Sequence, residues 1–270
     1  MHARRDTIWI LFLALSVASA SAADPAKKKV ESKREDFTVA EHKAFIILPE
    51  TAPKDRPIRW VWYAPTFHKS LPGGAEKWMF NHFFEEGIAI AGVDVSESYG
   101  SQKGRAVYQA LYEELTTKRS FHRQPVLLAR SRGGLMLYNW AVEHPDSVAG
   151  IAGIYPVCNV ASYPGLNRAA GAYEMTPDQL NEKLTEHNPI DRLAPLAKAK
   201  VPIFHIHGDV DKVVPLEANS GEVARRYKEL GGKMELVVPK GQGHNLWEGF
   251  FTCRELVDFV LTRCETEKGK

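Results

Sequence analysis

The sequence has 270 residues, a formal net charge of +2 and 44% hydrophobic residues. This length and composition are typical of one globular domain with a sizeable core. The near-neutral charge excludes the strongly basic field that proteins use to hold nucleic acid, so we expect no nucleic-acid partner.

The N-terminus has the layout of a secretory signal peptide, which we predict for residues 1–22. Two arginines precede an apolar run at 8–17, and small residues follow it, with cleavage expected near Ala22. The run has about half of the roughly 20 apolar residues that a membrane span needs. We therefore expect an exported protein, periplasmic or extracellular, with no membrane span after cleavage and with a charged lead-in at 23–40.

Seven apolar segments have the composition of buried strands, and longer segments with helical spacing separate several of them. The strands are expected at 43–49, 58–65, 87–95, 125–131, 148–156, 201–208 and 234–240. Strands that alternate with helices favour a mostly parallel sheet covered by helices on both faces. We expect this α/β domain to span residues 41–270.

One connection between expected strands, residues 155–200, is much longer than a simple loop. Glycines and prolines punctuate its first part, and a helix is predicted to follow, with Thr176 as the cap, Pro177 in the first turn and Gln179 at the capping-box position. A long connection of this kind usually covers a functional site, so we expect a short, lid-like insertion here.

The expected strand at 125–131 turns into a helical pattern around Ser131. Such a sharp turn needs small residues, and Ala129, Gly133 and Gly134 supply them. The pattern is that of a nucleophile elbow, G-x-S-x-G, with alanine in place of the first glycine. It predicts a nucleophilic serine.

Two later loops carry an acid and a base. Asp209 and Asp211 follow the strand at 201–208, and His244 lies in a glycine-flanked loop after the strand at 234–240. The order serine, acid, histidine is that of the α/β-hydrolase fold, and a histidine base is what a weak serine nucleophile requires. On these residues alone, either aspartate can be the acid.

From about Lys43 to Cys264 the sequence resembles the α/β-hydrolases, close to the prolyl-oligopeptidase and dienelactone-hydrolase-like serine hydrolases. The resemblance is carried by residues 129–134, by "HGDVDKVVP" and by "GQGHNLW". It implies a mostly parallel central sheet flanked by helices, with the insertion after the sixth strand of that fold. It also implies a triad of Ser131, Asp211 and His244, with Asp209 as a loop-shaping residue and the less favoured acid.

The same resemblance implies an oxyanion hole made of two backbone N–H groups. The first is the amide of Arg132, immediately after the nucleophile. For the second, the chain departs from the His-Gly common in the family, because it has Ala64-Pro65 and a proline has no N–H to donate. We expect Thr66 to supply this donor, with Phe67 as the alternative.

Several side chains near the expected triad are candidates for binding substrate. They are Arg130, Glu97, Tyr99, Tyr63 and Trp247. A buried guanidinium is costly unless it is paired, so Arg130 and Arg132 are expected either to pair with nearby acids or to face the substrate. For each aromatic residue, ordinary core packing is an equal alternative, and for Glu97 it is exposure to water.

We interpret the chain as a serine hydrolase that cleaves carboxylic esters through an acyl-enzyme, with a small-molecule or carbohydrate ester as substrate. A uronate ester is one candidate, because Ser131-Arg132 resembles the "SR" of glucuronoyl esterases, although this shorter chain lacks their lysine after the glycine. The alternatives are a small serine peptidase of prolyl-oligopeptidase type, since "SRGG" resembles its "SxGG", and a non-catalytic binding protein.

No cofactor or metal is expected. The sequence has no dinucleotide or P-loop motif, and His205 and His207 lie in an apolar strand without a third ligand at suitable spacing. Three cysteines cannot all pair within one chain, and two of them, Cys253 and Cys264, would lie about 16 Å apart if they share a helix. Pairing of Cys158 with either one stays open, as does the oligomeric state.

Overall fold

The computed structural model describes residues 30–67 and 70–265. The predicted signal peptide at 1–22 lies outside these residues. None of the described helices is long and apolar enough to cross a membrane.

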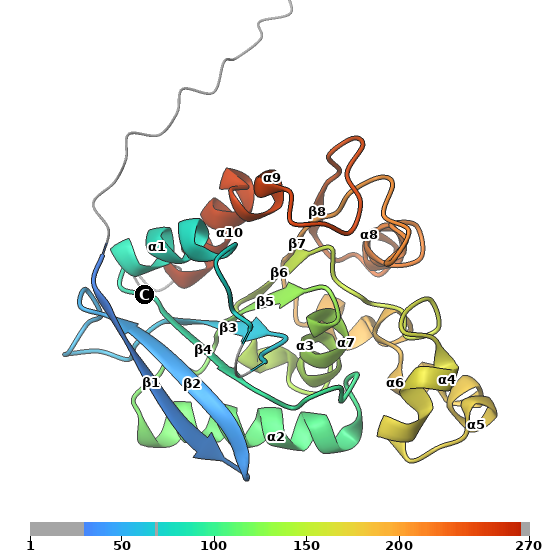
Figure 1. The fold of residues 1–270 in the computed structure, drawn as a ribbon, viewed down its shortest axis with the longest axis horizontal. Helices are drawn as coiled ribbons and strands as arrows, with labels where there is room; N and C mark the ends of the chain where they lie inside the picture. Colours follow the sequence, from blue (N-terminus) through green and yellow to red (C-terminus); the bar gives the residue numbers. More distant parts are fainter. Residues whose placement is uncertain (1–29, 68–69, 266–270) are drawn as a thin grey trace, which may run out of the picture.

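Eight strands form a single sheet in the order β1-β2-β4-β3-β5-β6-β7-β8 (Figure 1). Their bounds are β1 (Ser32–Val39), β2 (His42–Pro49), β3 (Trp60–Ala64), β4 (Ala89–Val93), β5 (Val126–Arg130), β6 (Gly150–Ile154), β7 (Ile203–Ile206) and β8 (Met234–Val237). The strands from β3 to β8 pair in parallel, and β1 and β2 add an antiparallel edge. The predicted mostly parallel sheet is confirmed, and each of the seven predicted strands overlaps one of β2 to β8.

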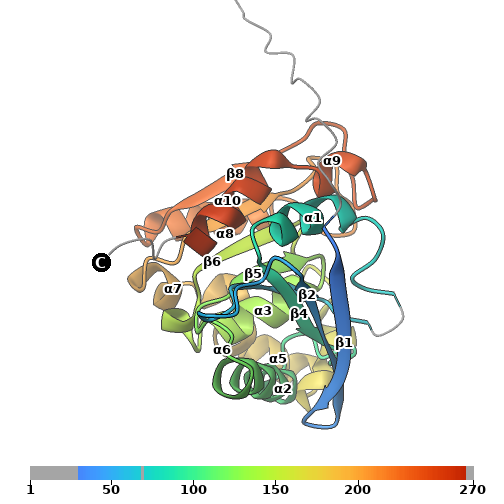
Figure 2. The same cartoon turned by 90° about the vertical axis from the view of Figure 1, so that its left-hand side faces the viewer.

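Helices cover both faces of this sheet (Figures 1 and 2). The main ones are α1 (Lys77–Glu85), α2 (Gln102–Glu113), α3 (Gly133–Ala141), α8 (Ser220–Glu229), α9 (Glu248–Phe251) and α10 (Arg254–Glu265). Side chains of α2, α3 and α8 share one buried apolar cluster with the sheet, and side chains of α1 and α10 share another. The sheet is therefore apolar on both faces, as its continuous hydrophobic strands require.

The insertion at 155–200 follows β6, the sixth strand. It holds α4 (Leu166–Ala169), α5 (Pro177–Glu182), α6 (Leu184–His187) and α7 (Ala194–Lys198), and its own apolar cluster packs on Leu135 of α3. The capping box predicted at the start of α5 is present, with the Thr176 hydroxyl accepting the Gln179 N–H and the Gln179 side chain accepting the Thr176 N–H. The helix expected to continue from there is interrupted at Lys183.

Residues 32–39, which we expected to belong to a charged lead-in, form the edge strand β1 instead. This strand pairs with β2 along its whole length, from Ser32 opposite Pro49 to Val39 opposite His42. Only Val39 is buried, and Phe37 packs against the core from a partly exposed position. Charged side chains are common on exposed edge strands because they discourage pairing with another chain. The charge that made this segment look like a lead-in is therefore compatible with a strand.

The three cysteines are free and buried. Cys264 lies in α10 and Cys253 precedes the first residue of that helix. Burial raises the pKa of each of the three thiols, which disfavours the reactive thiolate.

Candidate active site

Ser131 lies at the sharp turn between β5 and α3. Its φ of +50° is in the left-handed region, which non-glycine residues rarely adopt. Three backbone hydrogen bonds hold the turn: the Ser131 N–H donates to the Ile154 carbonyl at 3.0 Å, and the Ser131 carbonyl accepts from Gly134 and Val157 at 3.0 and 2.8 Å. The turn therefore holds the serine in a strained conformation that projects it from the sheet.

The two glycines after the turn are required by close contact rather than by a special φ. A Cβ at Gly133 would collide with the Ala64 carbonyl, and a Cβ at Gly134 would collide with the Val157 carbonyl. The elbow is thus packed directly onto the ends of β3 and of the segment after β6, as the small residues in the sequence indicate.

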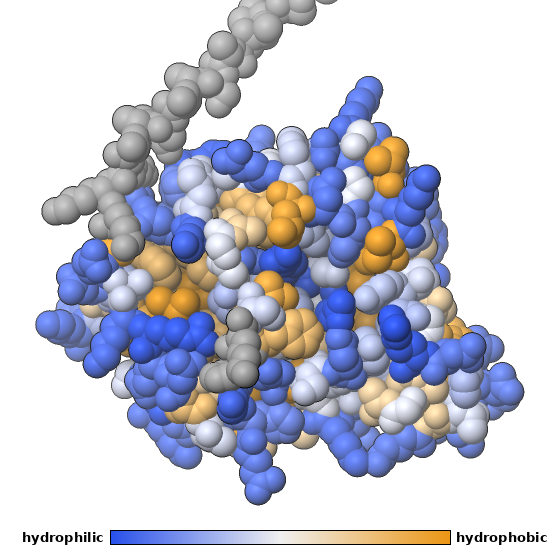
Figure 3. Space-filling model, viewed as in Figure 1, coloured by the Kyte–Doolittle hydropathy of each residue, from blue (hydrophilic) through white to orange (hydrophobic). Residues whose placement is uncertain are grey.

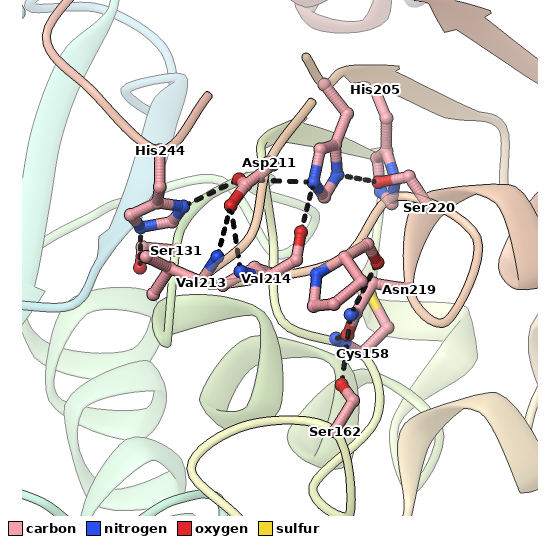
Figure 4. Close-up of polar contacts among 12 residues, drawn as sticks. Ser131, Cys158, Ser162, His205, Asp211, Val213, Val214, Asn219, Ser220 and His244 are labelled. Carbon is pink, nitrogen blue, oxygen red and sulfur yellow. Dashed lines mark hydrogen bonds and ion pairs between the residues drawn. The ribbon is translucent and has the colours of Figure 1, made fainter. Parts of the chain in front are cut away.

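Ser131, His244 and Asp211 form one hydrogen-bonded series (Figure 4). Ser131 Oγ lies 2.8 Å from His244 Nε2, and His244 Nδ1 lies 2.8 Å from Asp211 Oδ2. The three residues follow β5, β8 and β7 at the carboxyl ends of parallel strands, where α/β sheets bind ligands. Because Nδ1–H donates to the carboxylate, the Nε2 lone pair faces the serine hydroxyl.

The Asp211 carboxylate is buried and well supplied with donors. Its Oδ1 accepts from the backbone N–H groups of Val213 and Val214 at 2.9 and 2.8 Å. Burial acts to raise the pKa of Asp211, but hydrogen bonds from His207, His244 and Val214 outweigh it and hold this pKa well below the usual range. Asp211 is therefore ionised throughout the physiological pH range.

Asp209, the less favoured acid, lies elsewhere. It is exposed, and its Oδ1 accepts the Gly241 N–H at 2.6 Å. This contact ties the acid loop to the loop that carries His244. Asp211 is therefore the aspartate that hydrogen-bonds to His244, and Asp209 is the one that links the two loops.

Tyr155 supports the His244 imidazole from one side. The two ring centroids are 4.4 Å apart, and Phe250 packs edge-on against Tyr155 with a centroid distance of 5.0 Å. This packing limits the rotation of the imidazole, in addition to its two hydrogen bonds.

Ser131 opens into a pocket of about 220 Å³. Apolar side chains from Phe67, Leu71, Tyr155 and Leu246 line it, together with Arg130 and Arg132. On the face shown in Figure 3, apolar side chains form several separate patches among hydrophilic ones. The pocket can therefore hold an apolar group beside the serine.

Both arginines at the elbow are paired with acids. Arg130 Nη1 lies 2.5 Å from Glu76 Oε1, and the fully buried Glu76 also accepts the Tyr63 hydroxyl at 2.7 Å and the Gly73 N–H at 2.9 Å. Arg132 pairs with Glu97. The expected pairing with acids is therefore present for both arginines, and both also line the pocket.

Four side chains expected to bind substrate are not among the described residues that line this pocket. Tyr63 is fully buried and supports Glu76, which corrects its expected contact with substrate. Tyr99 is 7% exposed and belongs to the apolar cluster of the insertion. Trp247 is 40% exposed and packs against Phe250. Glu97 reaches the site only through Arg132.

Sequence reasoning missed Glu76, Leu71 and Leu246. Leu246 comes directly after the catalytic loop residues, and Leu71 and Glu76 lie in the segment that follows the β3 end. For Leu71, the available signal was its place shortly after the expected donor Thr66, which follows the end of β3. No local signal indicated Glu76.

The candidate oxyanion donors differ in availability. The Phe67 N–H donates to the Leu71 carbonyl at 3.1 Å, so the alternative donor is already used. Within residues 30–67 and 70–265, no hydrogen bond is described for the backbone N–H of Arg132 or Thr66. These two remain the proposed donors.

His205 and His207 are both fully buried under the site. They hydrogen-bond to neighbouring side chains and to the Val214 carbonyl. In the part of the chain that the structure describes, no group of three or more His, Cys, Asp or Glu residues is arranged to hold a metal ion.

Comparison with known proteins identifies the fold and the family. A model of the prolyl oligopeptidase family matches residues 106–260, more than half of the chain. The acylamino-acid-releasing enzyme of Arabidopsis thaliana is 26% identical over 129 residues, which are 44% of this chain and 17% of that enzyme. A puromycin hydrolase structure is 18% identical with a TM-score of 0.67, covering 90% of this chain and 40% of the other.

An acylaminoacyl peptidase from Pyrococcus horikoshii gives a similar result, with 17% identity, a TM-score of 0.66, and coverage of 90% of this chain and 44% of that one. The chain thus spans less than half the length of these relatives. The fold is the α/β-hydrolase fold. Because the family model matches most of the domain, the chain belongs to the prolyl oligopeptidase family.

Proposed function

We propose that this protein is a serine peptidase that hydrolyses the amide bond of a small peptide or aminoacyl substrate. The observation that carries the proposal is the hydrogen-bonded series Ser131, His244 and Asp211 in a chain that belongs to the prolyl oligopeptidase family. The relatives include an acylamino-acid-releasing enzyme, an acylaminoacyl peptidase and a puromycin hydrolase.

This proposal replaces the ester hydrolase that we inferred first from the sequence. The family match and the relatives favour the peptidase alternative, and none of the relatives reported above is a carbohydrate esterase. The pairing of Arg132 with Glu97 also weakens the comparison with uronate esterases, because that guanidinium is already neutralised.

In the proposed mechanism Ser131 Oγ attacks the amide carbonyl and His244 Nε2 takes the hydroxyl proton. Asp211 stabilises the imidazolium that forms, and the N–H groups of Arg132 and Thr66 stabilise the oxyanion, each by about 3 kcal/mol. His244 then gives its proton to the leaving amine as the C–N bond breaks. Water hydrolyses the acyl-enzyme by the same steps.

The pocket limits the group next to the scissile bond. An apolar cavity of about 150 Å³ holds a benzene ring, so the pocket of about 220 Å³ at Ser131 has room for one apolar side chain or aryl group. Phe67, Leu71 and Leu246 favour such a group, and Arg130 is too closely paired with Glu76 to demand an anion. We propose an apolar residue at this position.

We also propose that the protein is exported. This part of the proposal rests on the sequence of residues 1–22.

The test is a matched panel of substrates with the same acyl group, N-acyl-phenylalanine or phenylalanine, joined to an aryl amide or an aryl ester. Acetylated sugars and methyl uronates complete the panel. We expect hydrolysis of the amides, with a lower kcat/KM when alanine or glutamate replaces phenylalanine. Ser131→Ala should reduce kcat by roughly 10⁴-fold or more.

Hydrolysis of the methyl uronates or acetylated sugars, without any cleavage of the peptide amides, would instead return the assignment to an esterase. A folded wild-type protein that cleaves nothing in the panel and does not react with a fluorophosphonate would indicate a binding protein.

A further inference from the structure

The mechanism does not use His207, although this residue contacts the acid of the triad. His207 Nε2 lies 3.4 Å from Asp211 Oδ2, the same oxygen that accepts from His244. It also lies 2.8 Å from the Val214 carbonyl. His207 and His244 therefore contact the same oxygen of the Asp211 carboxylate.

The two neighbours of Nε2 determine where the proton of His207 lies. A carbonyl oxygen and an ionised carboxylate can only accept, so Nε2 must carry a hydrogen and donate it. In the neutral imidazole, Nδ1 is then an acceptor, and the Ser220 hydroxyl lies 2.8 Å from it. Ser220 therefore donates its only proton to His207.

The other hydrogen bonds of the series also have a fixed donor and acceptor, and they extend into the core. Since Ser220 Oγ has given its proton to His207, it accepts from His205 Nδ1 at 2.9 Å. His205 Nε2 is then an acceptor for the Tyr138 hydroxyl at 2.8 Å. Tyr138, His205 and Ser220 thus each donate to one acceptor. The last donor, His207 Nε2–H, faces two acceptors, the Val214 carbonyl at 2.8 Å and Asp211 Oδ2 at 3.4 Å.

This series is rigid because it is buried and comes from three elements. Tyr138 lies in α3, His205 and Ser220 lie in β7 and at the start of α8, and all three are fully buried (Figure 4 shows Ser220 beside His205). Burial and the nearby His207 lower the pKa of His205 to about 3, so this ring stays neutral and keeps its role. A fully satisfied buried network orders its members.

His207 also closes the acid loop on itself. The Val214 N–H donates to Asp211 Oδ1, while the Val214 carbonyl accepts from His207. One imidazole thus holds both the carboxylate and the backbone that orients it. Displacement of this imidazole would remove its contact with Asp211 and its hydrogen bond to the Val214 carbonyl.

We propose that His207 is a positioning residue for catalysis: its Nε2–H, held in place by Ser220, His205 and Tyr138, aims Asp211 Oδ2 at His244. The inference rests on the proposed function, because it requires that Asp211 serves His244 in turnover. The buried series of Tyr138, His205, Ser220 and His207 would then contribute to the rate of catalysis as well as to the stability of the fold.

Two substitutions separate the two ends of the imidazole. In His207→Gln the side-chain amide reaches the place of Nε2 and can still donate to Asp211, but no acceptor remains for Ser220. In His207→Asn the amide lies at the place of Nδ1, so it can still meet Ser220 and cannot reach Asp211. If His207 only maintains the buried series, the His207→Asn variant should be the more active of the two. If His207 positions Asp211, the His207→Gln variant should be the more active.

The measurement is kcat and KM on the best aryl amide, with the rate of fluorophosphonate labelling as a second readout. We expect His207→Asn to lower kcat and the labelling rate roughly tenfold to a hundredfold with KM changed less than about twofold. His207→Gln should retain kcat within about threefold. Equal effects of the two variants, greater activity of Asn, or a loss confined to KM would overturn the proposal.

Ser220→Ala provides a variant that does not touch Asp211, for use if a substitution at 207 prevents folding. It removes the hydroxyl that orients His207 but leaves the Nε2–H donor. As for His207→Gln, which loses the same contact, we expect the fall in kcat to be limited to about threefold, at constant KM; an unchanged kcat would overturn the proposal. The control is His144→Phe, just after the far end of α3, where the His144 ring packs against Trp140. Its kcat should equal that of wild type.

A wild-type protein that neither labels nor turns over would overturn the proposed function itself, and the inference with it. Labelling of the wild type together with unaffected His207 variants would overturn the inference alone.

Discussion

Glu76 is the residue that allows a guanidinium to lie beside the nucleophile. Its carboxylate is fully buried and is satisfied by Arg130, Tyr63 and the Gly73 N–H. The pKa of Tyr63 is raised well above its usual value by burial and by the Glu76 charge, so this phenol stays a donor to the carboxylate. The charge of Arg130 is thereby neutralised, and the pocket beside Ser131 carries little net charge.

We predict that Glu76→Gln destabilises the protein by about 3 kcal/mol, because it leaves the Arg130 charge without its buried partner. The control is Glu174→Gln, which breaks the exposed pair of Lys103 and Glu174 and should cost less than about 1 kcal/mol. Denaturation by urea measures both free energies of unfolding. If the two variants lost the same free energy of unfolding, the buried pair of Glu76 and Arg130 would contribute no more to stability than the exposed pair.

The residue scale also shows where sequence reasoning was sufficient. Ser131, His244 and the two aspartates could be found because each follows a predicted strand in a recognisable motif. Glu76 could not be found, because its role depends on the contact of a segment before α1 with the end of β5, which no local pattern encodes. Tyr63 was misjudged for the same reason: its exposure depends on packing against that segment.

At the scale of elements, the elbow and the end of β3 form one closely packed unit. The Gly133 backbone lies against the Ala64 carbonyl, and the Val157 N–H bonds to the Ser131 carbonyl. The nucleophile and the proposed donor Thr66 thus belong to segments that cannot move apart independently. The position of Ser131 therefore depends on the absence of side chains at Gly133 and Gly134.

We therefore predict that Gly133→Ala lowers the rate of amide hydrolysis by roughly a hundredfold or more, because a shift of about 1 Å at a nucleophile has that effect. Gly171→Ala is the matched control, since a Cβ there meets nothing within 4 Å, and it should keep the wild-type rate. Steady-state kinetics on the same aryl amide provide the comparison. A Gly133→Ala enzyme with normal kcat would contradict the close packing described for the elbow.

Among the elements, the seven apolar strands were predictable because continuous hydrophobic runs between turn residues are characteristic of a buried parallel sheet. The edge strand β1 was not, because six of its eight side chains are polar or charged and exposed: Ser32, Lys33, Arg34, Glu35, Asp36 and Thr38. Its pairing with β2 is a tertiary property.

At the scale of the whole molecule, the sequence motifs determined the fold and the class of chemistry but not the bond that is cleaved. Ser131 followed by Arg132 occurs in a pattern that resembles both esterases and peptidases, and both use the same triad and oxyanion hole. The match of residues 106–260 to the prolyl oligopeptidase family favours amide hydrolysis, which is why we propose a peptidase. Bond preference depends on the wider substrate environment, which a short motif around the nucleophile does not describe.

The buried histidine His205 predicts how global stability depends on pH. Its pKa is about 3 in the folded protein, against about 6.5 in an unfolded chain. Between these values the unfolded chain binds a proton that the folded protein excludes. The free energy of unfolding is therefore fully retained above pH 6.5 and should fall below it by up to about 1.4 kcal/mol per pH unit.

His205→Gln tests this sign, because glutamine does not titrate. Unfolding measured at several values between pH 7.5 and pH 4.5 should give a shallower acid slope for the variant than for wild type, even though the variant is less stable at neutral pH. Parallel curves for the two proteins would mean that His205 is not the group responsible.

The most direct test of the central claim, that Ser131 is the nucleophile of an active hydrolase, is the mass of the protein after reaction with a fluorophosphonate, followed by peptide mapping. We predict one adduct per chain, located on Ser131, and none on a folded Ser131→Ala variant. An adduct on another residue, or an unmodified wild-type protein, would contradict the claim.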